Sequence, residues 1–222
     1  MHLIFESLDL IHDNEPHPAA LNMAVDEILL HGLSRPLLRI YRWLRPSVSF
    51  GYFEKYELVE AAHPGLDPVR RWTGGGVVPH GNDLTYSLLV PAGSLFLQLS
   101  AADSYRAIHE RIARAMSRAG FAVTMTGAND EKISQACFEN PTRHDILFQG
   151  RKIAGAAQRR TKFGLLHQGS IQNVDLPPAL RECLAAEFSG QIIGRGLEQA
   201  EVDAARALAG AKYATDAWTR KF

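Results

Sequence analysis

The amino-acid sequence predicts an α+β fold, with a mainly antiparallel or mixed sheet and flanking helices. Two patterns carry this prediction: short runs with the period-two alternation of strands, and longer segments in which apolar residues recur every three or four positions. The order of these segments fits one α+β domain. No internal repeat, low-complexity stretch or proline-rich linker marks a boundary, and 222 residues are enough for one sizeable core.

Four segments have the apolar periodicity of helices. The first begins near residue 18 and ends by residue 32, and the second covers about 100–119 and stops at Gly120. The last part of the chain is predicted to be helical over about 178–188 and 198–208. We expect these helices to flank the sheet.

The strand predictions rest on short alternating runs bounded by turn residues. They cover 38–43, 48–53, 84–91, 121–125 and 163–171, with a hairpin over 145–159 that turns at Gln149-Gly150. Two glycines modify these strands. We expect Gly51 to be a bulge or a point of close backbone approach, and Gly169 to interrupt its strand.

Composition narrows the classes of function. Lys+Arg and Asp+Glu both total 24, so no general electrostatic attraction to nucleic acid or to an anionic membrane is expected. No stretch reaches about 18 apolar residues, and the amino terminus does not resemble a signal peptide. We therefore expect a cytoplasmic protein with no nucleic-acid or membrane partner. The two cysteines, Cys137 and Cys183, are too few for a disulfide scaffold.

The stretch from Arg70 to Ser87 departs most from an ordinary globular pattern. Two arginines, Arg70 and Arg71, precede three consecutive glycines at 74–76. Adjacent glycines are kept where a ligand or another backbone must come close, and arginine side chains can bind a carboxylate or phosphate. The alternative is a glycine bulge between two strands with solvated arginines, and the residues alone leave both interpretations open.

Lys152 is a candidate for binding an acyl oxygen or a phosphate. It follows the Gln149-Gly150 turn and precedes a run of small residues at 153–157, which could form the floor of a cleft. The alternative is a solvated lysine after a turn. Only the adjacent glycine and alanine run favours the functional interpretation.

Cys137 is a candidate nucleophile, although a lone cysteine is more often a small buried hydrophobic residue. His80, His144 and His167 are candidate bases for it. Cys183 lies in an amphipathic segment and is interpreted as a core residue.

His80 and Asp83 could form a histidine–carboxylate pair that orients a base, although Asp83 is equally explained as a cap at the start of a strand. No third ligand has recognisable spacing, so no metal site is predicted. The glycines do not form a Rossmann or Walker motif ahead of a helix.

Four separated motifs together resemble one family. They are NMAVDE at 22–27, RRWTGGG at 70–76 with His80 and DLTYS at 83–87, GRKIAGAAQ at 150–158, and HQGS at 167–170. In this order they resemble the biotin/lipoate protein ligase catalytic-domain family over nearly the whole chain. Within it the chain looks most similar to lipoate-protein ligases and cysteine-dependent octanoyltransferases.

The resemblance implies a single catalytic domain over residues 1–222, of biotin/lipoate ligase type and without a C-terminal accessory lobe. It also implies catalytic roles for Cys137 and Lys152. The implied substrate-binding residues are Arg70, Arg71, Gly74, Gly75, Gly76, His80, Asp83, Ala154, Gly155, Ala156, His167 and Gly169. An octanoyl tail needs a dry slot, which small residues can provide, while the reacting carbonyl needs fixed positive charge at one end.

Three functions follow as hypotheses. The first is a transferase that moves an octanoyl or lipoyl group through a Cys137 thioester, without a cofactor, to the lysine of a lipoyl carrier protein, either the glycine cleavage H protein or a dehydrogenase E2 lipoyl domain. Acyl carrier protein would be the donor. The second is a lipoate-protein ligase that uses ATP and Mg²⁺, with a separate accessory subunit. The third is a non-catalytic acyl-binding protein on the same fold.

Overall fold

The computed structural model of the chain describes residues 3–127 and 143–222. The elements up to residue 100 are β1 (Leu8–His17), α1 (Ala19–Gly32), β2 (Leu37–Trp43), β3 (Ser47–Phe50), α2 (Tyr56–Ala62), β4 (Asp67–Arg70), β5 (Val77–His80), β6 (Leu84–Pro91) and the 3₁₀ turn η1 (Leu95–Gln98). The later elements are α3 (Ala101–Arg118), β7 (Val123–Met125), β8 (Ile146–Phe148), β9 (Arg151–Thr161), β10 (Gly164–Ile171), α4 (Leu180–Phe188), β11 (Ile192–Gly194), α5 (Gln199–Leu208), the π-helical turn η2 (Ala209–Tyr213) and α6 (Asp216–Thr219).

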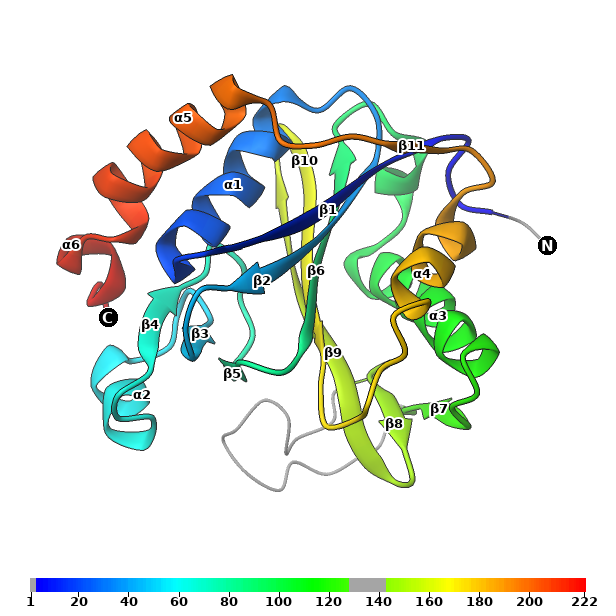
Figure 1. Cartoon of the computed structure of the whole chain (residues 1–222), viewed down its shortest axis with the longest axis horizontal. Coiled ribbons are helices and arrows are strands. Elements are labelled where there is room, and N and C mark those ends of the chain that lie inside the picture. The colour runs from blue at the N-terminus through cyan, green and yellow to red at the C-terminus, as the bar shows by residue number, and fades with distance from the viewer. Residues whose placement is uncertain (1–2, 128–142) are drawn as a thin grey trace.

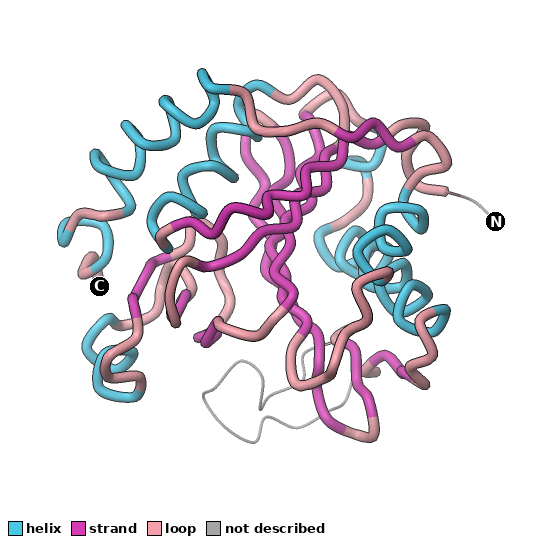
Figure 2. The backbone as a smooth tube through the Cα atoms, in the orientation of Figure 1, coloured by secondary structure: helices cyan, strands magenta, loops and turns pink. Residues whose placement is uncertain are grey.

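An eight-stranded mixed sheet runs through the centre of the molecule (Figure 2). Its strand order is β11-β1-β2-β6-β10-β9-β8-β7, with β1 parallel to both of its neighbours and the other pairs antiparallel. A second sheet of three strands has the order β4-β3-β5. The predicted α+β class with a mainly antiparallel or mixed sheet is confirmed.

Helices cover both faces of the large sheet. In Figure 1, α1 and α5 lie on one side of it, and α3 and α4 lie on the other. Each side has its own hydrophobic core: Met23 and Leu30 of α1 belong to one, and Ile108 and Ile112 of α3 belong to the other. The predicted helices thus bury their apolar faces against the sheet. None of the described helices has both the length and the apolar character needed to cross a membrane.

The hairpin between β8 and β9 turns as predicted at Gln149 and Gly150. Their φ angles are 51° and 76°, so both residues adopt the left-handed conformation required by a type I′ turn. By contrast, the prediction that Gly169 interrupts its strand is wrong. β10 pairs without a break with both β6 and β9, and a Cβ atom at Gly169 would lie 2.2 Å from the hydroxyl oxygen of Tyr86. The glycine makes room for that ring.

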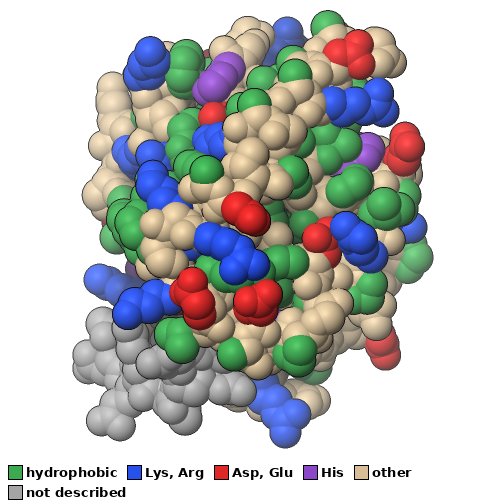
Figure 3. Space-filling view, turned by 90° about the vertical axis from the view of Figure 1, so that its left-hand side faces the viewer, with side chains coloured by type: hydrophobic (Ala, Val, Ile, Leu, Met, Phe, Trp, Pro, Cys, Tyr) green, Lys and Arg blue, Asp and Glu red, His purple; other side chains and the backbone are tan. Residues whose placement is uncertain are grey.

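Charged side chains of both signs are interspersed on the face of the molecule seen in Figure 3. This mixture agrees with the equal totals of basic and acidic residues in the sequence. Any strong positive charge offered to a ligand is therefore local.

Candidate active site

The glycine-rich loop joins β4 to β5 and passes close to the end of β3. Gly75 has a φ of +82°, a conformation that favours glycine. A Cβ atom at Gly51 would lie 1.8 Å from the carbonyl oxygen of Gly75. Because any side chain at position 51 would push the loop away, the prediction that Gly51 is a point of close backbone approach is confirmed.

Arg71 holds this loop from the inside. Its Nη2 donates to the carbonyl oxygens of Gly74 at 3.0 Å and Gly76 at 2.7 Å. Its Nη1 donates to Ser49 Oγ on β3 at 2.8 Å. The guanidinium therefore fixes the loop against the small sheet and brings a positive charge to its inner surface.

A narrow cavity lies between the loop and the large sheet. The structure brings six of the predicted binding residues to its wall: Arg71, Gly75, His80, Gly155, Ala156 and Gly169. Six further wall residues are Met23, Trp43, Ser49, Thr85, Gln168 and Ser170. Since glycine and alanine occupy many wall positions, the cavity suits a slender apolar ligand that carries a polar group.

A chain of hydrogen bonds runs along the cavity wall through Ser49, His80 and Asp83. Ser49 Oγ lies 2.7 Å from His80 Nε2, and His80 Nδ1 lies 2.8 Å from Asp83 Oδ2. The ring of Trp43 stacks on the imidazole, with centroids 4.1 Å apart and an angle of 17° between the planes. The predicted His80–Asp83 pair is therefore present, and the histidine is fixed in orientation.

Several donors keep the carboxylate of Asp83 ionised. Its Oδ2 also accepts hydrogen bonds from Thr85 Oγ1 and Ser170 Oγ, both at 2.6 Å. Burial raises the pKa of Asp83, but the hydrogen bond and charge of His80 and the two hydroxyl donors outweigh burial and lower the pKa well below its usual value. Asp83 is thus a fixed negative charge behind His80.

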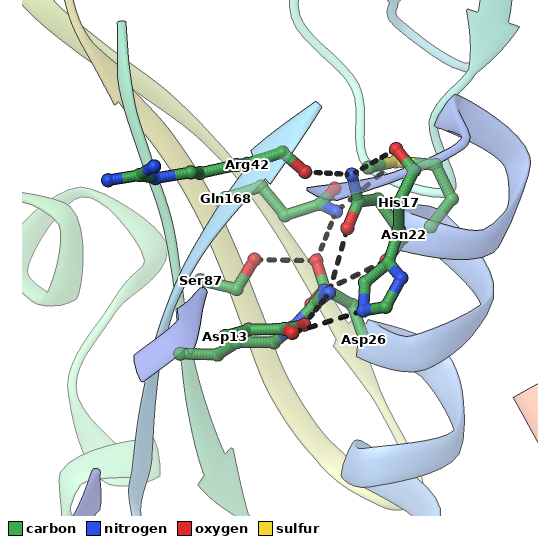
Figure 4. Close-up of polar contacts among 9 residues, drawn as sticks. Asp13, His17, Asn22, Asp26, Arg42, Ser87 and Gln168 are labelled. Atoms are coloured by element: carbon green, nitrogen blue, oxygen red, sulfur yellow. Dashed lines mark hydrogen bonds and ion pairs between the residues drawn. The ribbon is translucent and has the colours of Figure 1, made fainter. Parts of the chain in front are cut away.

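The cavity floor is fixed by Gln168. Its Nε2 donates to Asp26 Oδ2 on α1 at 2.8 Å (Figure 4). Its Oε1 accepts from Thr73 Oγ1 at 2.8 Å. Asp26 also accepts from Ser87 Oγ at 2.5 Å and from Arg39 Nη1 at 2.8 Å. The glycine loop, the sheet and α1 are therefore linked through one side-chain amide.

Arg39 extends this network below the floor. It is fully buried and donates to Asp13 Oδ2 on β1, at 3.0 Å from Nε and 2.6 Å from Nη2. Its Nη2 also donates to Asn22 Oδ1 at 2.8 Å. The buried guanidinium of Arg39 thus has two carboxylate partners, Asp13 and Asp26. It holds α1 on the sheet and so positions Met23.

Lys152 forms a buried ion pair beside Gly155, a residue of the cavity wall. Its Nζ lies 2.7 Å from Asp145 Oδ2, and the hydroxyl of Tyr105 donates to Asp145 Oδ1 at 2.6 Å. The backbone N–H of Ala156 donates to the same Tyr105 hydroxyl at 3.0 Å. These contacts give Lys152 a defined direction and exclude the alternative of a solvated lysine.

The Lys152 ammonium lies against Gly155, a residue of the cavity wall. A Cβ atom at Gly155 would be 2.6 Å from Lys152 Cε and 2.9 Å from Nζ. The absence of a side chain at Gly155 therefore makes the room in which the lysine lies. The small residues at 155–157 line the cavity, and the sequence predicted that the run after Lys152 could form the floor of a cleft.

Arg70 does not line the cavity, contrary to the sequence prediction. It is fully buried, and all three of its nitrogens donate to backbone carbonyl oxygens. The acceptors are the carbonyls of Gly51, Tyr52, Glu54, Trp218 and Thr219. Arg70 thus connects the loop after β3 to the C-terminal segment.

His167 and Ala154 also lie away from the cavity, on the side of the sheet that α3 covers. Ala154 belongs to the hydrophobic core there. His167 Nε2 is 3.3 Å from the Tyr86 hydroxyl, and its Nδ1 is 3.0 Å from Gln158 Nε2. Burial, with the nearby charge of His109, lowers the pKa of His167 well below its ordinary value. It is a neutral residue packed in the core.

Cys137, the predicted nucleophile, lies outside the described residues. The sequence analysis also missed Ser49 and Gln168 as wall residues. Position 49 carried a usable signal, because alternation within 48–53 places Ser49 and Gly51 on one face of a strand. Among residues 3–127 and 143–222, no three His, Cys, Asp or Glu side chains come together in a way that could hold a metal ion.

A family comparison agrees with this geometry. The profile described as Lipoyl protein ligase A/B catalytic domain matches residues 18–192. The chain belongs to this family. The matched range contains the glycine loop, Lys152 and every wall residue named above.

The chain is also similar to individual proteins named as octanoyltransferases and lipoate protein ligases. The octanoyltransferase LipM of Staphylococcus aureus is 36% identical over 172 residues, which cover 70% of this chain and 62% of that protein. The chain thus spans less than two thirds of the length of this relative. A putative lipoate protein ligase of Thermoplasma acidophilum with bound lipoic acid superimposes with a TM-score of 0.78 at 23% identity, covering 98% of this chain and 99% of that one.

A further solved structure is a bipartite lipoate protein ligase of Thermoplasma acidophilum, studied with its E2 lipoyl domain. It has a TM-score of 0.74 and 21% identity, and the match covers 97% of this chain and 96% of that chain. Both solved structures confirm the fold of a lipoyl protein ligase A/B catalytic domain.

Proposed function

We propose that the chain transfers an octanoyl group to the lysine of a lipoyl carrier domain, through a thioester on Cys137. The observation that carries this proposal is the narrow cavity with Lys152 fixed against its wall at Gly155. A slender apolar tail fits between small residues, and the buried ammonium supplies the positive charge that a reacting carbonyl needs. The identity of 36% to a protein named octanoyltransferase supports this choice of acyl group.

The chemistry divides into two transfers. The Cys137 thiolate attacks the carbonyl of octanoyl-acyl carrier protein, the bond to the carrier thiol breaks, and a new thioester forms. The amine of the acceptor lysine then attacks this thioester, an amide forms, and the cysteine thiolate leaves. In both steps Lys152 stabilises the negative charge that develops on the acyl oxygen. No cofactor takes part in this scheme.

The lipoyl carrier domain is the proposed partner because its lysine is the acceptor in this chemistry. The glycine cleavage H protein and a dehydrogenase E2 domain are the two forms to compare. The bipartite ligase of similar fold was studied with its E2 lipoyl domain, which supports a carrier of that class.

The alternative is an ATP-dependent ligase that forms an acyl-adenylate. In that scheme Arg70 would serve the phosphate, yet the donors of Arg70 are bonded to backbone carbonyls. This arrangement favours the transferase. If the ligase operates, ATP and Mg²⁺ are required and free octanoate is the substrate.

The deciding experiment combines the protein with octanoyl-acyl carrier protein and each lipoyl carrier, without ATP, and measures octanoylated carrier by mass spectrometry. We expect amide product with the native protein and with Cys183→Ser, and none with Cys137→Ser. Cys183 is the matched control, since it is the other cysteine of the chain.

Two results would overturn the proposal. One is product formation only from free octanoate with ATP and Mg²⁺, which would identify a ligase. The other is saturable octanoate binding with no transfer in either mixture, which would identify an acyl-binding protein.

A further inference from the structure

The hydrogen-bond chain at the cavity wall has the order and spacing of a serine–histidine–carboxylate triad. Ser49 Oγ and His80 Nε2 are 2.7 Å apart, and His80 Nδ1 and Asp83 Oδ2 are 2.8 Å apart. Both distances are within the range in which a nucleophile, its base and an orienting group exchange hydrogen bonds. The transfer scheme proposed above assigns no chemical step to Ser49, His80 or Asp83.

The donors and acceptors around the chain define where each proton lies. Arg71 can only donate, so Ser49 Oγ accepts its hydrogen bond at 2.8 Å and has its own proton available for His80 Nε2. The Asp83 carboxylate only accepts, so His80 carries its proton on Nδ1. In the neutral imidazole with its proton on Nδ1, His80 Nε2 accepts the serine proton, and this is the tautomer that a general base requires.

The serine and the histidine are positioned to meet a ligand. Ser49 and His80 both line the cavity, whereas Asp83 lies behind them. Arg71 places a positive charge next to Ser49 Oγ, and this charge stabilises the oxygen as its proton leaves. Trp43 and the donors to Asp83 hold the imidazole in place.

We propose that Ser49, His80 and Asp83 form a second acyl-accepting centre, which hydrolyses medium-chain acyl thioesters and activated esters bound in the cavity. Ser49 Oγ bonds to the acyl carbon while its proton moves to His80 Nε2. The bond to the thiol or alcohol breaks, and the leaving group takes that proton. Water then attacks the acyl-serine ester and gives a proton to His80, the bond from the acyl carbon to Ser49 Oγ breaks, and His80 returns the proton to Ser49 Oγ. The products are the free acid and restored Ser49.

The choice of an acyl group rests on the proposed function, but the serine chemistry does not use Cys137. Hydrolysis is therefore tested in the full-length Cys137→Ala protein, where transfer through the cysteine is absent. Failure of hydrolysis leaves the transferase assay unaffected, and failure of transfer leaves the hydrolysis assay unaffected.

The experiment uses two probes on the Cys137→Ala protein. An octyl fluorophosphonate labels activated serines, and peptide mass spectrometry locates the adduct. Hydrolysis of p-nitrophenyl octanoate and octanoyl-pantetheine is followed by released chromophore and thiol. We expect the adduct on Ser49, and hydrolysis reduced about 100-fold or more when Ser49→Ala or His80→Gln is added.

Ser47→Ala is the matched control, because Ser47 lies on the same strand but donates to the carbonyl of Arg45. Its hydrolysis rate should equal that of the Cys137→Ala parent. The proposal is overturned if Ser49 is not labelled in the parent, or if Ser49→Ala hydrolyses as fast as the parent. Labelling of the parent needs no variant at Ser49, so a folding defect in Ser49→Ala cannot obscure the result.

Discussion

Asp145 and Lys152 form an ion pair of 2.7 Å whose two side chains are almost completely removed from solvent. A buried ammonium is stable only with a compensating partner, so the carboxylate determines both the charge and the direction of the lysine. The Tyr105 hydroxyl in turn fixes the carboxylate, which links α3 to Lys152 on β9.

We predict that Asp145→Asn lowers the free energy of unfolding by about 3 kcal/mol, because it removes the carboxylate that lies 2.7 Å from the buried Lys152 ammonium. Transfer should also fall sharply. Chemical denaturation and the octanoyl transfer assay measure the two effects. Asp67→Asn is the control: Asp67 pairs with Arg45 at the surface, so its loss should cost less than about 1 kcal/mol. Equal losses in both variants would contradict the prediction.

Gly155→Ala should reduce transfer about 100-fold while the protein remains folded. The new Cβ atom would lie 2.9 Å from Lys152 Nζ and would displace the ammonium from its present position. Steady-state transfer rates measure this effect, and circular dichroism checks the fold. Gly194→Ala serves as control, because a Cβ atom there meets nothing within 4 Å. A normal transfer rate in Gly155→Ala would show that the reaction does not depend on the position of the Lys152 ammonium.

The two adjacent arginines should respond differently to replacement by lysine. Arg70→Lys should loosen the C-terminal segment, because lysine cannot reach carbonyls on both Glu54 and Thr219, but should keep octanoate binding. Arg71→Lys should weaken binding, since the glycine loop loses its clamp. Hydrogen exchange of residues 216–222 and octanoate titration distinguish these outcomes. If octanoate binding is lost in Arg70→Lys and kept in Arg71→Lys, then Arg70, and not Arg71, supports the ligand site.

His109 should make the protein less stable in mild acid. Burial lowers its pKa from 6.5 to about 4, a shift only partly offset by the charge of Asp145. Between these two values the unfolded chain binds more protons than the folded one, so stability falls as the pH decreases from 6.5 towards 4, by about 1.4 kcal/mol per pH unit.

The His109→Phe variant tests this source of pH dependence. It keeps a ring to stack on Tyr105, whose centroid is 4.1 Å from that of His109, and removes two buried nitrogens that have no hydrogen-bond partner among the described residues. Unfolding free energies at pH 7.5 and pH 5 should differ less in the variant than in the native protein. An unchanged difference would assign the effect to other groups.

The sequence predicted the elements whose signals are local. Helix α3 has an amphipathic pattern, and Ser100 caps it by accepting from the backbone N–H of Asp103. Strand β1 was missed because Asp13 and His17 break its apolar pattern. Both side chains point inward, and the partner that makes this favourable, Arg39, lies 26 residues away from Asp13 along the chain. No local signal reports such a pairing.

The site was predictable in its motifs but not in the direction of each side chain. Arg70 and Arg71 have the same charge, yet only the second faces the cavity, because neighbouring residues of an extended chain point to opposite sides. Similarly, Ser49 becomes a candidate only when β3 pairs with β5, which places His80 opposite Ser47 and within hydrogen-bond distance of Ser49. Resemblance to the family identified the segments, and the packing of the sheets decided which residues meet.

The contact of Gly51 with the carbonyl of Gly75 has a consequence for engineering acyl-chain length. A glycine wall has no side chain to shorten, and adding one at either position meets backbone or the Cβ atom of Ala157. Under the proposed function, variants that accept a longer or bulkier acid are to be sought at Met23 of α1, a wall residue whose flexible thioether can be exchanged for a smaller or larger side chain. The rigid side sets the reference position of the ligand, and the helix side sets its permitted size.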